Sequence, residues 1–415
     1  MRIEERKVKL SEIATFSYGK MPKKELLGMG EYPTYSGYRY QYAYPEFNCH
    51  AGDVIVVARG VGGTGDVKLV REKCYLTNLA IRIELDKHQV DNQFFYYKFL
   101  NSGLRHLDSG SAQSQITIND LKNERIDLPA IQRQKEIAGI LCSLDDKIHL
   151  NQQMNQSLES IAQTIFKSWF VDFDPVKAKM EGREPEGMDA ETAALFPDSL
   201  VESELGLIPE GWNILNIDDV ASITKGKSYK SVELEPSTTA LVTLKSFQRG
   251  GGYRTDGLKE YTGSFKASQV VNPGDLIVSY TDVTQKAELI GRPAFVYADG
   301  SHETYVISLD VAVIRPIVGT SMSKEFLYSV MKTDRFTEHT YSHSTGTTVL
   351  HLSKDAVPSY SFAFPGDGLV QRFTEICLPI YQQILVNHQE SINLASIRNT
   401  LLPKLISGEI QIPTE

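Results

Sequence analysis

The chain lacks the features that mark several broad classes of protein. Its 415 residues include four cysteines, none in a CxxC pair, so neither a zinc knuckle nor a disulfide framework is suggested. No stretch approaches the ~20 consecutive apolar residues of a membrane span. The charged start, MRIEERKVKL, does not resemble a signal peptide. These absences predict a cytoplasmic protein without a membrane partner.

Motifs for several kinds of catalysis are also missing. No GxxxxGK[ST] phosphate loop occurs, and no Asn/Asp-Pro-Pro-aromatic motif of the kind that holds an extruded adenine. The run Gly60–Gly65 fits GxGxxG, but strands are expected after it, whereas a dinucleotide site needs a helix. His339 and His343 form an HxxxH pair without the glutamate of a zinc protease helix. We therefore expect no catalytic residue, no metal and no cofactor in this chain.

What the chain does contain is an internal repeat. Adding 236 to positions between Pro129 and Phe170 aligns two copies of one segment without a gap, so that Asn151 meets Asn387. Nearer the start, Gly19 and Lys20 match Gly226 and Lys227 at an offset of 207. The growing offset places the extra residues of the second copy in loops. A tandem pair of globular units, each followed by a helix, is typical of a protein that reads two things at a fixed separation.

Each copy ends in a long helix with a coiled-coil pattern. From Ile137 and again from Phe373, apolar residues recur at alternating intervals of four and three. Polar Asn151 and Asn387 interrupt the pattern midway and are expected to fix the register. Pro403 is expected to end the second helix early. The expected packing positions are Ile137, Leu141, Leu144, Ile148, Asn151, Leu158, Ile165, Phe373, Ile380, Ile384, Asn387, Leu394 and Leu401.

Short β-type runs separated by Gly-rich turns fill the rest of each copy. They predict an α+β fold with a curved, mostly antiparallel sheet and short helices. We place the first globular unit at residues 1–130, its helix at 131–170 and an ordered, acidic linker at 171–210. The second globular unit covers 211–365, and its helix and tail cover 366–415. The alternative to paired helices is that each one packs only on its own globular unit.

Three segments resemble a known family. Leu128–Gly182 and Phe196–Trp212 are similar to the central conserved region of type I restriction-modification specificity subunits, and Leu401–Ile410 resembles the distal one. The chain departs from the family in lacking a Pro-Glu-Gly-Trp entry before the first repeat. The resemblance implies two target-recognition domains that read the halves of a split, asymmetric DNA site. It also implies two conserved helices that pair antiparallel as a spacer.

The resemblance further implies partners that carry the chemistry. Two modification subunits would dock on the chain and methylate adenine N6 with S-adenosylmethionine. Restriction subunits would add ATP- and Mg-dependent translocation and cleavage. The length of the helices agrees with a spacer role, because ~38 residues at 1.5 Å each span ~57 Å. An antiparallel pair also gives pseudo-twofold symmetry and two equivalent docking faces.

Candidate DNA contacts are basic, amide and hydroxyl side chains in loops. Each of them has the alternative of being merely solvated. In the first copy the candidates are Lys20, Lys23, Lys24, Arg39, Arg59, Gln113 and Gln115. In the second copy they are Lys225, Lys227, Lys230, Lys245, Arg249, Arg254 and Thr347.

Other functions remain open on the sequence alone. The chain fits the DNA-reading subunit of a type IIB-like system with different enzymatic partners, which neighbouring genes would distinguish. A protein-interaction scaffold, dimerised through its helices, is a second alternative. Salt-dependent duplex binding with a sequence preference would argue against the scaffold. A free-standing nuclease or methyltransferase would show its activity in the purified chain.

Overall fold

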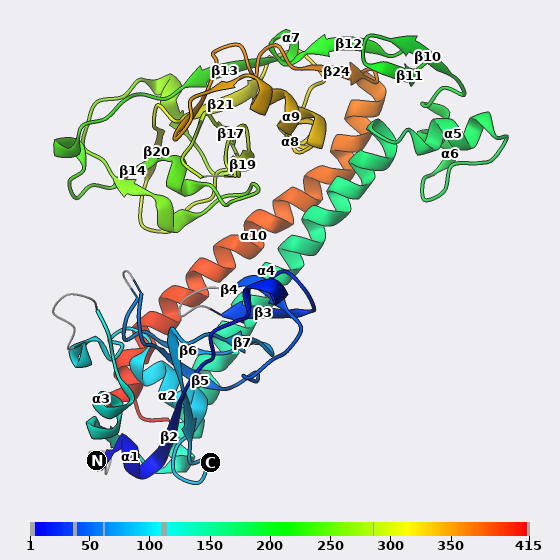
Figure 1. The fold of residues 1–415 in the computed structure, drawn as a ribbon. Coiled ribbons are helices and arrows are strands. Elements are labelled where there is room, and N and C mark those ends of the chain that lie inside the picture. The colour runs from blue at the N-terminus through cyan, green and yellow to red at the C-terminus, as the bar shows by residue number, and fades with distance from the viewer. Residues whose placement is uncertain (1–4, 36–39, 61–62, 109–113, 285, 413–415) are drawn as a thin grey trace. The chain divides into compact units, whose positions relative to one another are not determined.

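A computed structural model describes residues 5–35, 40–60, 63–108, 114–284 and 286–412 (Figure 1). The chain divides into two compact units. The first unit comprises residues 1–148 and 394–415, and the second comprises residues 149–393. Both units therefore contain part of each long helix.

The globular part of the first unit is built on small sheets with short helices. One sheet is antiparallel and has the order β2(Ala14–Tyr18), β8(Ala80–Leu85), β5(Val54–Val57), β6(Val67–Leu69). A second has the order β4(Tyr40–Tyr44), β3(Tyr32–Tyr35), β7(Tyr75–Leu76), with β3 parallel to β7. A third joins β1(Arg6–Lys9) to β9(Arg125–Leu128). The short helices are α1(Leu10–Ile13), α2(Asn92–Phe99) and α3(Ile118–Asn123).

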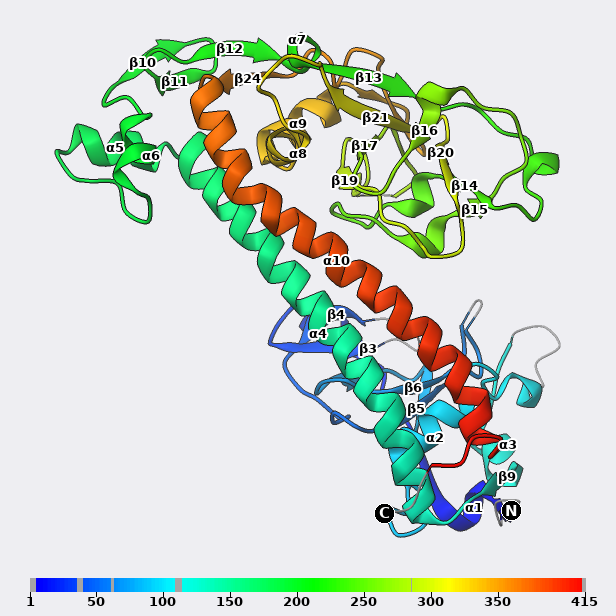
Figure 2. The ribbon, with the colours of Figure 1, turned by 180° about the vertical axis from the view of Figure 1, so that it is seen from behind.

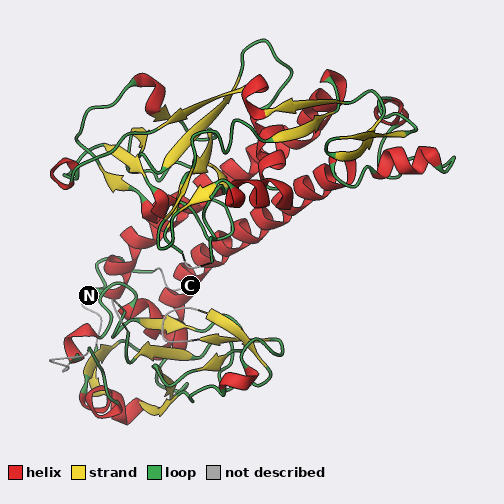
Figure 3. Ribbon diagram, turned by 45° about the horizontal axis from the view of Figure 1, so that its top comes forward, coloured by secondary structure: helices red, strands yellow, loops and turns green. Residues whose placement is uncertain are grey.

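The globular part of the second unit repeats this plan (Figure 3). Its antiparallel sheet has the order β13(Ala221–Lys225), β21(Val311–Pro316), β17(Leu276–Ser279), β19(Pro293–Phe295). Its mixed sheet has the order β15(Lys259–Glu260), β14(Thr239–Val242), β20(Thr304–Ile307), β16(Val270–Val271), with β14 parallel to β20. β12(Asn213–Asn216) pairs with β24(Ser361–Phe364). The helices are α7(Ile217–Val220), α8(Lys324–Met331) and α9(Asp334–Ser342).

Further elements belong to one unit each. The second unit adds a sheet of β18(Thr281–Asp282), β23(Leu350–Leu352) and β22(Ser344–Thr345). Its linker holds α5(Asp174–Met180), α6(Ala190–Ala194) and the hairpin β10(Leu200–Ser203)–β11(Gly206–Pro209). The 3-10 turns are η1(Lys24–Leu26), η2(Arg105–Leu107), η3(Ser231–Glu233), η4(Leu244–Ser246), η5(Thr255–Gly257) and η6(Ala267–Gln269).

The glycines at matching positions of the repeat explain one shared turn. A Cβ added to Gly19 would collide with the carbonyl oxygens of Leu76 and Thr77. The same addition to Gly226 would collide with the carbonyl oxygens of Ile307 and Ser308. Only glycine permits this close approach of two backbones. The first strand of both antiparallel sheets thus leaves its sheet in the same way.

The two long helices are α4(Ile131–Phe170) and α10(Asp367–Ile406), each of 40 residues. In the first unit, Ile137 and Leu141 of α4 share a buried cluster with Leu402 and Leu405 of α10. In the second unit, the rings of Phe166 and Phe373 lie 5.6 Å apart. The start of each helix therefore packs on the end of the other, and Figures 1 and 2 show them side by side. The predicted α+β fold with an antiparallel helix pair is confirmed.

The expected packing positions differ in their burial. Ile137, Leu141, Phe373 and Ile384 are buried, as are Asn151 and Asn387. The remaining positions are partly buried: Leu144, Ile148, Leu158, Ile165, Ile380, Leu394 and Leu401. The expected early end at Pro403 is wrong, because α10 continues to Ile406. Leu402 and Leu405, on either side of the proline, are buried in the core of the first unit and hold this last turn in place.

Within the described residues, no helix combines the length and the apolar character needed to cross a membrane.

Cys49 and Cys74, distant in the sequence, face each other across an isolated antiparallel bridge. Each backbone N–H donates to the carbonyl of the other residue at 3.1 Å, and both thiols are buried and free.

Candidate nucleic-acid interface

Three lysines follow the first strand of the first unit. Lys20, Lys23 and Lys24 are exposed; the first two lie between β2 and the turn η1, and Lys24 is the first residue of η1. Two backbone bonds hold the segment: Lys20 N donates to the Leu76 carbonyl at 2.9 Å, and Lys23 N donates to the Tyr44 hydroxyl at 3.2 Å. A fixed backbone that presents exposed ammonium groups suits contacts to phosphate.

Arg59 and Gln115 come from distant segments and are brought together. They face each other across an isolated antiparallel bridge, next to a backbone bond of 3.0 Å from Ile116 N to the Ala58 carbonyl. The Asp108 carboxylate accepts from Gln115 N at 2.8 Å and so helps to hold the segment. Arg39 and Gln113 lie outside the described residues, as does part of the glycine run that begins at Gly60.

Two candidate lysines of the second unit, Lys225 and Lys227, make intramolecular contacts. Lys225 Nζ lies 4.0 Å from the centre of the Tyr280 ring, and burial lowers the pKa of this lysine. Lys227 Nζ donates to the carbonyl oxygen of Ser264 and contacts the Ser264 hydroxyl at 3.2 Å. Lys227 occupies the same repeat position as Lys20, so an equal place in the sequence has produced different surroundings. A phosphate would have to compete with these contacts.

The two candidate arginines of the second unit, Arg249 and Arg254, each pair with a carboxylate. Arg249 Nη1 lies 3.4 Å from Glu288, and Arg254 donates to both oxygens of Asp256 at 2.8 and 2.6 Å. Such exposed pairs are weak and exchange readily with other anions. Lys230 and Lys245 are exposed. The sequence thus identified basic residues on the surface, but it did not show which of them already have a protein partner.

Thr347 lines a polar hollow of about 770 Å³ in the second unit. The buried carboxylate of Asp282 shapes one wall of the hollow by accepting from the backbone N–H groups of Thr284, Leu289 and Ile290. Lys286 and Arg292 also line it, and the sequence analysis missed both of them. Both are basic residues in the loop between β18 and β19, so the criterion of basic loop residues could have found them. The hollow is lined by cationic, hydroxyl and carboxylate side chains, with Glu338 facing it besides the two cations.

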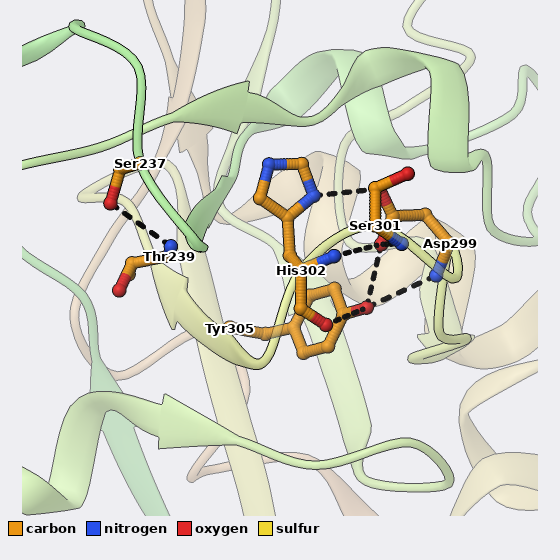
Figure 4. A network of polar contacts seen from close by, with 6 residues as sticks. All are labelled: Ser237, Thr239, Asp299, Ser301, His302 and Tyr305. Carbon is orange, nitrogen blue, oxygen red and sulfur yellow. Dashed lines mark hydrogen bonds and ion pairs between the residues drawn. The ribbon is translucent and has the colours of Figure 1, made fainter.

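A second polar network, centred on Asp299, holds the backbone of one turn in place (Figure 4). Asp299 accepts from the N–H groups of Ser301 and His302, from His302 Nδ1 at 2.7 Å and from the Tyr305 hydroxyl at 2.7 Å. Burial opposes ionisation of Asp299, but the hydrogen bonds from Tyr305 and His302 outweigh it and lower the pKa of the carboxyl group. This aspartate–histidine pair therefore organises the turn that leads into β20.

The HxxxH pair lies in the described part of the chain. There, no group of three or more His, Cys, Asp and Glu residues is placed to hold an ion. His339 and His343 stack with ring centres 4.2 Å apart, and Nε2 of His339 lies 2.9 Å from the Ala356 carbonyl. The HxxxH pair is thus engaged in packing at the end of α9.

The outer faces of the long helices carry exposed apolar residues at matching repeat positions. Leu150 of α4 is 49% exposed, and Val386, its mate in α10, is 59% exposed. Ile161 is 50% exposed, and its mate Ile397 is 48% exposed. Only the inward positions were predicted from the sequence, although these outward matches occur at the same offset of 236. The repeat therefore relates these exposed apolar positions to one another in pairs.

Known proteins share these features. A domain family described as the type I restriction modification DNA specificity domain matches residues 4–160. The type I restriction enzyme HindI specificity subunit of Haemophilus influenzae is 28% identical over 339 residues, which cover 71% of each chain. The MjaIX specificity subunit of Methanocaldococcus jannaschii is 24% identical over 344 residues, covering 81% of this chain and 73% of the relative.

A solved structure shares the fold. The crystal structure of the type I restriction-modification S subunit from M. genitalium aligns with a TM-score of 0.57 at 18% identity, covering 99% of this chain and 97% of that one. The likeness in fold thus extends over almost the whole length of both chains. The chain is therefore similar in sequence and in fold to specificity subunits of type I restriction-modification systems.

Proposed function

We propose that this chain reads a split, asymmetric DNA site, using the globular part of each unit for one half-site. The observation that carries the proposal is the repeated architecture: two globular parts of the same plan, each continuing into one of two antiparallel 40-residue helices. One reader on each side of a rigid spacer recognises two short sequences at a set distance. The loops differ between the copies, which suits two different half-sites.

The same proposal gives the helix pair a second role, the docking of two modification subunits. The exposed apolar positions Leu150 and Val386 support it, because the repeat relates them to one another. Two equivalent faces bind two copies of one partner. In this proposal the chain itself does no catalysis. The modification subunits bring S-adenosylmethionine for adenine-N6 methylation, and restriction subunits bring ATP and Mg for translocation and cleavage.

The test is a map of methylated adenines. The chain is expressed with the modification subunit encoded beside it, in a host without adenine methylation, and methylated positions are read across the genome. A motif of two short defined halves with a fixed gap supports the proposal. Absence of methylation despite co-purification of the two proteins contradicts it in this form and favours the type IIB-like alternative with other enzymatic partners.

The scaffold alternative makes a different prediction for the purified chain. A DNA reader binds duplex with an affinity that falls steeply as salt rises, and it prefers one sequence over its scrambled control. A protein scaffold shows neither property. Titration of labelled duplexes that carry the mapped motif, at two salt concentrations, separates the two functions.

A further inference from the structure

The globular part of each unit is joined to the helix pair by a contact between a buried tyrosine and a carboxylate. In the first unit, the Tyr97 hydroxyl of α2 donates to Asp145 Oδ2 of α4 at 2.8 Å. The guanidinium of Arg398, on α10, contacts the other oxygen of Asp145. Tyr97 is 2% exposed, so this polar contact lies within the core.

The second unit contains the same kind of contact. The Tyr328 hydroxyl of α8 donates to Glu159 Oε1 of α4 at 2.6 Å. Lys332 Nζ lies 3.2 Å from the same oxygen and supplies the positive charge. Tyr328 is 3% exposed. We refer to the two sets, Tyr97–Asp145–Arg398 and Tyr328–Glu159–Lys332, as the two latches.

The latches are not copies inherited through the repeat. The repeat matches Tyr328 with Tyr96 rather than Tyr97, and it matches Asp145 with Tyr381. Each unit thus reaches the same arrangement, a tyrosine, a carboxylate and a cation, with residues at non-equivalent positions. The two units form this contact with residues at non-equivalent repeat positions. This indicates that holding the globular part on the helices matters in both units.

The chemistry of the latches suits orientation more than stability. Burying a hydroxyl and a carboxylate costs free energy, and a well-packed apolar contact often stabilises as much. A hydrogen bond, however, weakens steeply when its angle or length changes, whereas apolar surfaces tolerate sliding. Burial, together with the adjacent carboxylate, raises the pKa of Tyr97 and of Tyr328. Both hydroxyls therefore remain protonated donors.

We propose that the two latches are positioning elements that fix the orientation of each DNA-reading part on the helix pair and thereby fix the gap between the half-sites. This inference rests on the function proposed above. The residues of the latches touch no DNA in this scheme. They act by limiting the angles at which the two readers are presented.

The test compares the gaps of methylated sites. Tyr328→Phe removes one hydrogen bond and keeps the ring, while Glu159→Gln keeps an acceptor for Tyr328 and removes the ion pair with Lys332. The matched control is Tyr253→Phe, whose buried hydroxyl has no hydrogen-bond partner among the described residues. We expect both latch variants to keep the two half-sites and to methylate sites whose gap differs by one base pair. Loss of a hydrogen bond to a charged group predicts about tenfold weaker discrimination between gaps.

A single unchanged gap in both variants, at wild-type methylation levels, overturns the latch proposal. If the wild-type chain yields no split motif, the proposed function fails instead, and the latch is judged by a physical measurement. Spin labels at the exposed positions Gln389 of α10 and Lys266 of the globular part report their distance distribution within the second unit. Tyr328→Phe is expected to broaden this distribution and Tyr253→Phe to leave it narrow. Equal widths overturn the proposal independently of any activity.

Discussion

At the scale of single residues, His388 shows how packing alters chemistry. Its ring, on α10, stacks on Tyr297 with centres 4.4 Å apart. Its Nε2 is buried and has no hydrogen-bond partner within the described residues. Burial is the main cause that lowers the pKa of His388 below its ordinary value of 6.5. The folded second unit therefore favours the neutral imidazole.

This preference predicts a pH dependence of stability. With a lowered folded pKa, the contribution of His388 is complete above the unfolded value of 6.5 and is lost as pH falls through the folded value. His388→Gln should therefore reduce the fall in Tm that the wild-type chain shows between about pH 7 and about pH 5. The exposed His149→Gln, on α4, serves as control. Identical pH profiles for wild type and His388→Gln would contradict the prediction.

Cys49 provides a prediction about which substitution the core of the first unit tolerates. It is fully buried opposite Cys74, and the corresponding pair in the second unit is Val271 and Tyr305, which face each other in β16 and β20. Valine fits the same kind of position, and the Cys49 thiol is only a weak donor to Asp53 at 3.4 Å. Cys49→Val should change the free energy of unfolding by less than about 1.5 kcal/mol. Urea denaturation measures it, and a loss of about 3 kcal/mol or more would refute the equivalence.

At the scale of elements, a polar layer lies at the middle of the helix pair. Asn151 Nδ2 donates to Glu390 at 2.8 Å, and Asn387 Nδ2 donates to Asn155 Oδ1 at 2.8 Å. Both asparagines are buried. A polar layer that pairs only in one alignment disfavours shifted registers at some cost in stability.

Replacing the layer with apolar residues should separate these two effects. The double variant Asn151→Leu with Asn387→Leu should raise the free energy of unfolding by roughly 1–3 kcal/mol. It should also broaden the gap between methylated half-sites, because shifted registers are no longer excluded. The exposed Gln152→Leu is the control and should do neither. A double variant with wild-type stability and a single gap would remove the register role.

The outer faces of the same helices give a binding prediction. Leu150→Lys with Val386→Lys places two charges where an apolar partner surface is expected, and burying unpaired charges is costly. Co-purification of the modification subunit should be lost while the Tm of the chain stays within a few degrees of wild type. Gln152→Lys, two residues from Leu150 on α4 and already exposed, should retain the partner. Retained binding by the double variant would place the docking face elsewhere.

The helices and strands also show how much of the fold could be predicted from the sequence. The long helices were predictable because a heptad pattern is local, so Ile137 and Phe373 mark the packed face without any knowledge of the fold. The parallel pairing of β3 with β7 was not, because it joins segments about forty residues apart. The candidate DNA contacts were least predictable. Whether Lys225 is free or lies over Tyr280 depends on tertiary packing that neither residue reveals in the sequence.

At the scale of the whole molecule, the repeat and the antiparallel pairing together define the midpoint of the helix pair. Ile148 and Ile384 are repeat mates near the midpoints of α4 and α10. If a segment is duplicated at the midpoint of each helix, the two added segments pack against each other. The helix pair then lengthens and keeps its packed heptad face. Seven residues are two turns of a coiled coil and preserve the heptad pattern. The globular parts and the latches keep their own surroundings.

This construction yields the last prediction. Duplicating residues 148–154 in α4 and 384–390 in α10 adds about 10.5 Å, which corresponds to about three base pairs of duplex. The methylated motif should keep both half-sites and gain about three base pairs in its gap. Duplication in α4 alone should break the pairing, lower the Tm and abolish methylation, because the two seams no longer match. A lengthened pair with a changed half-site would contradict the division of labour between helices and globular parts, since the bases would then be read by the spacer itself.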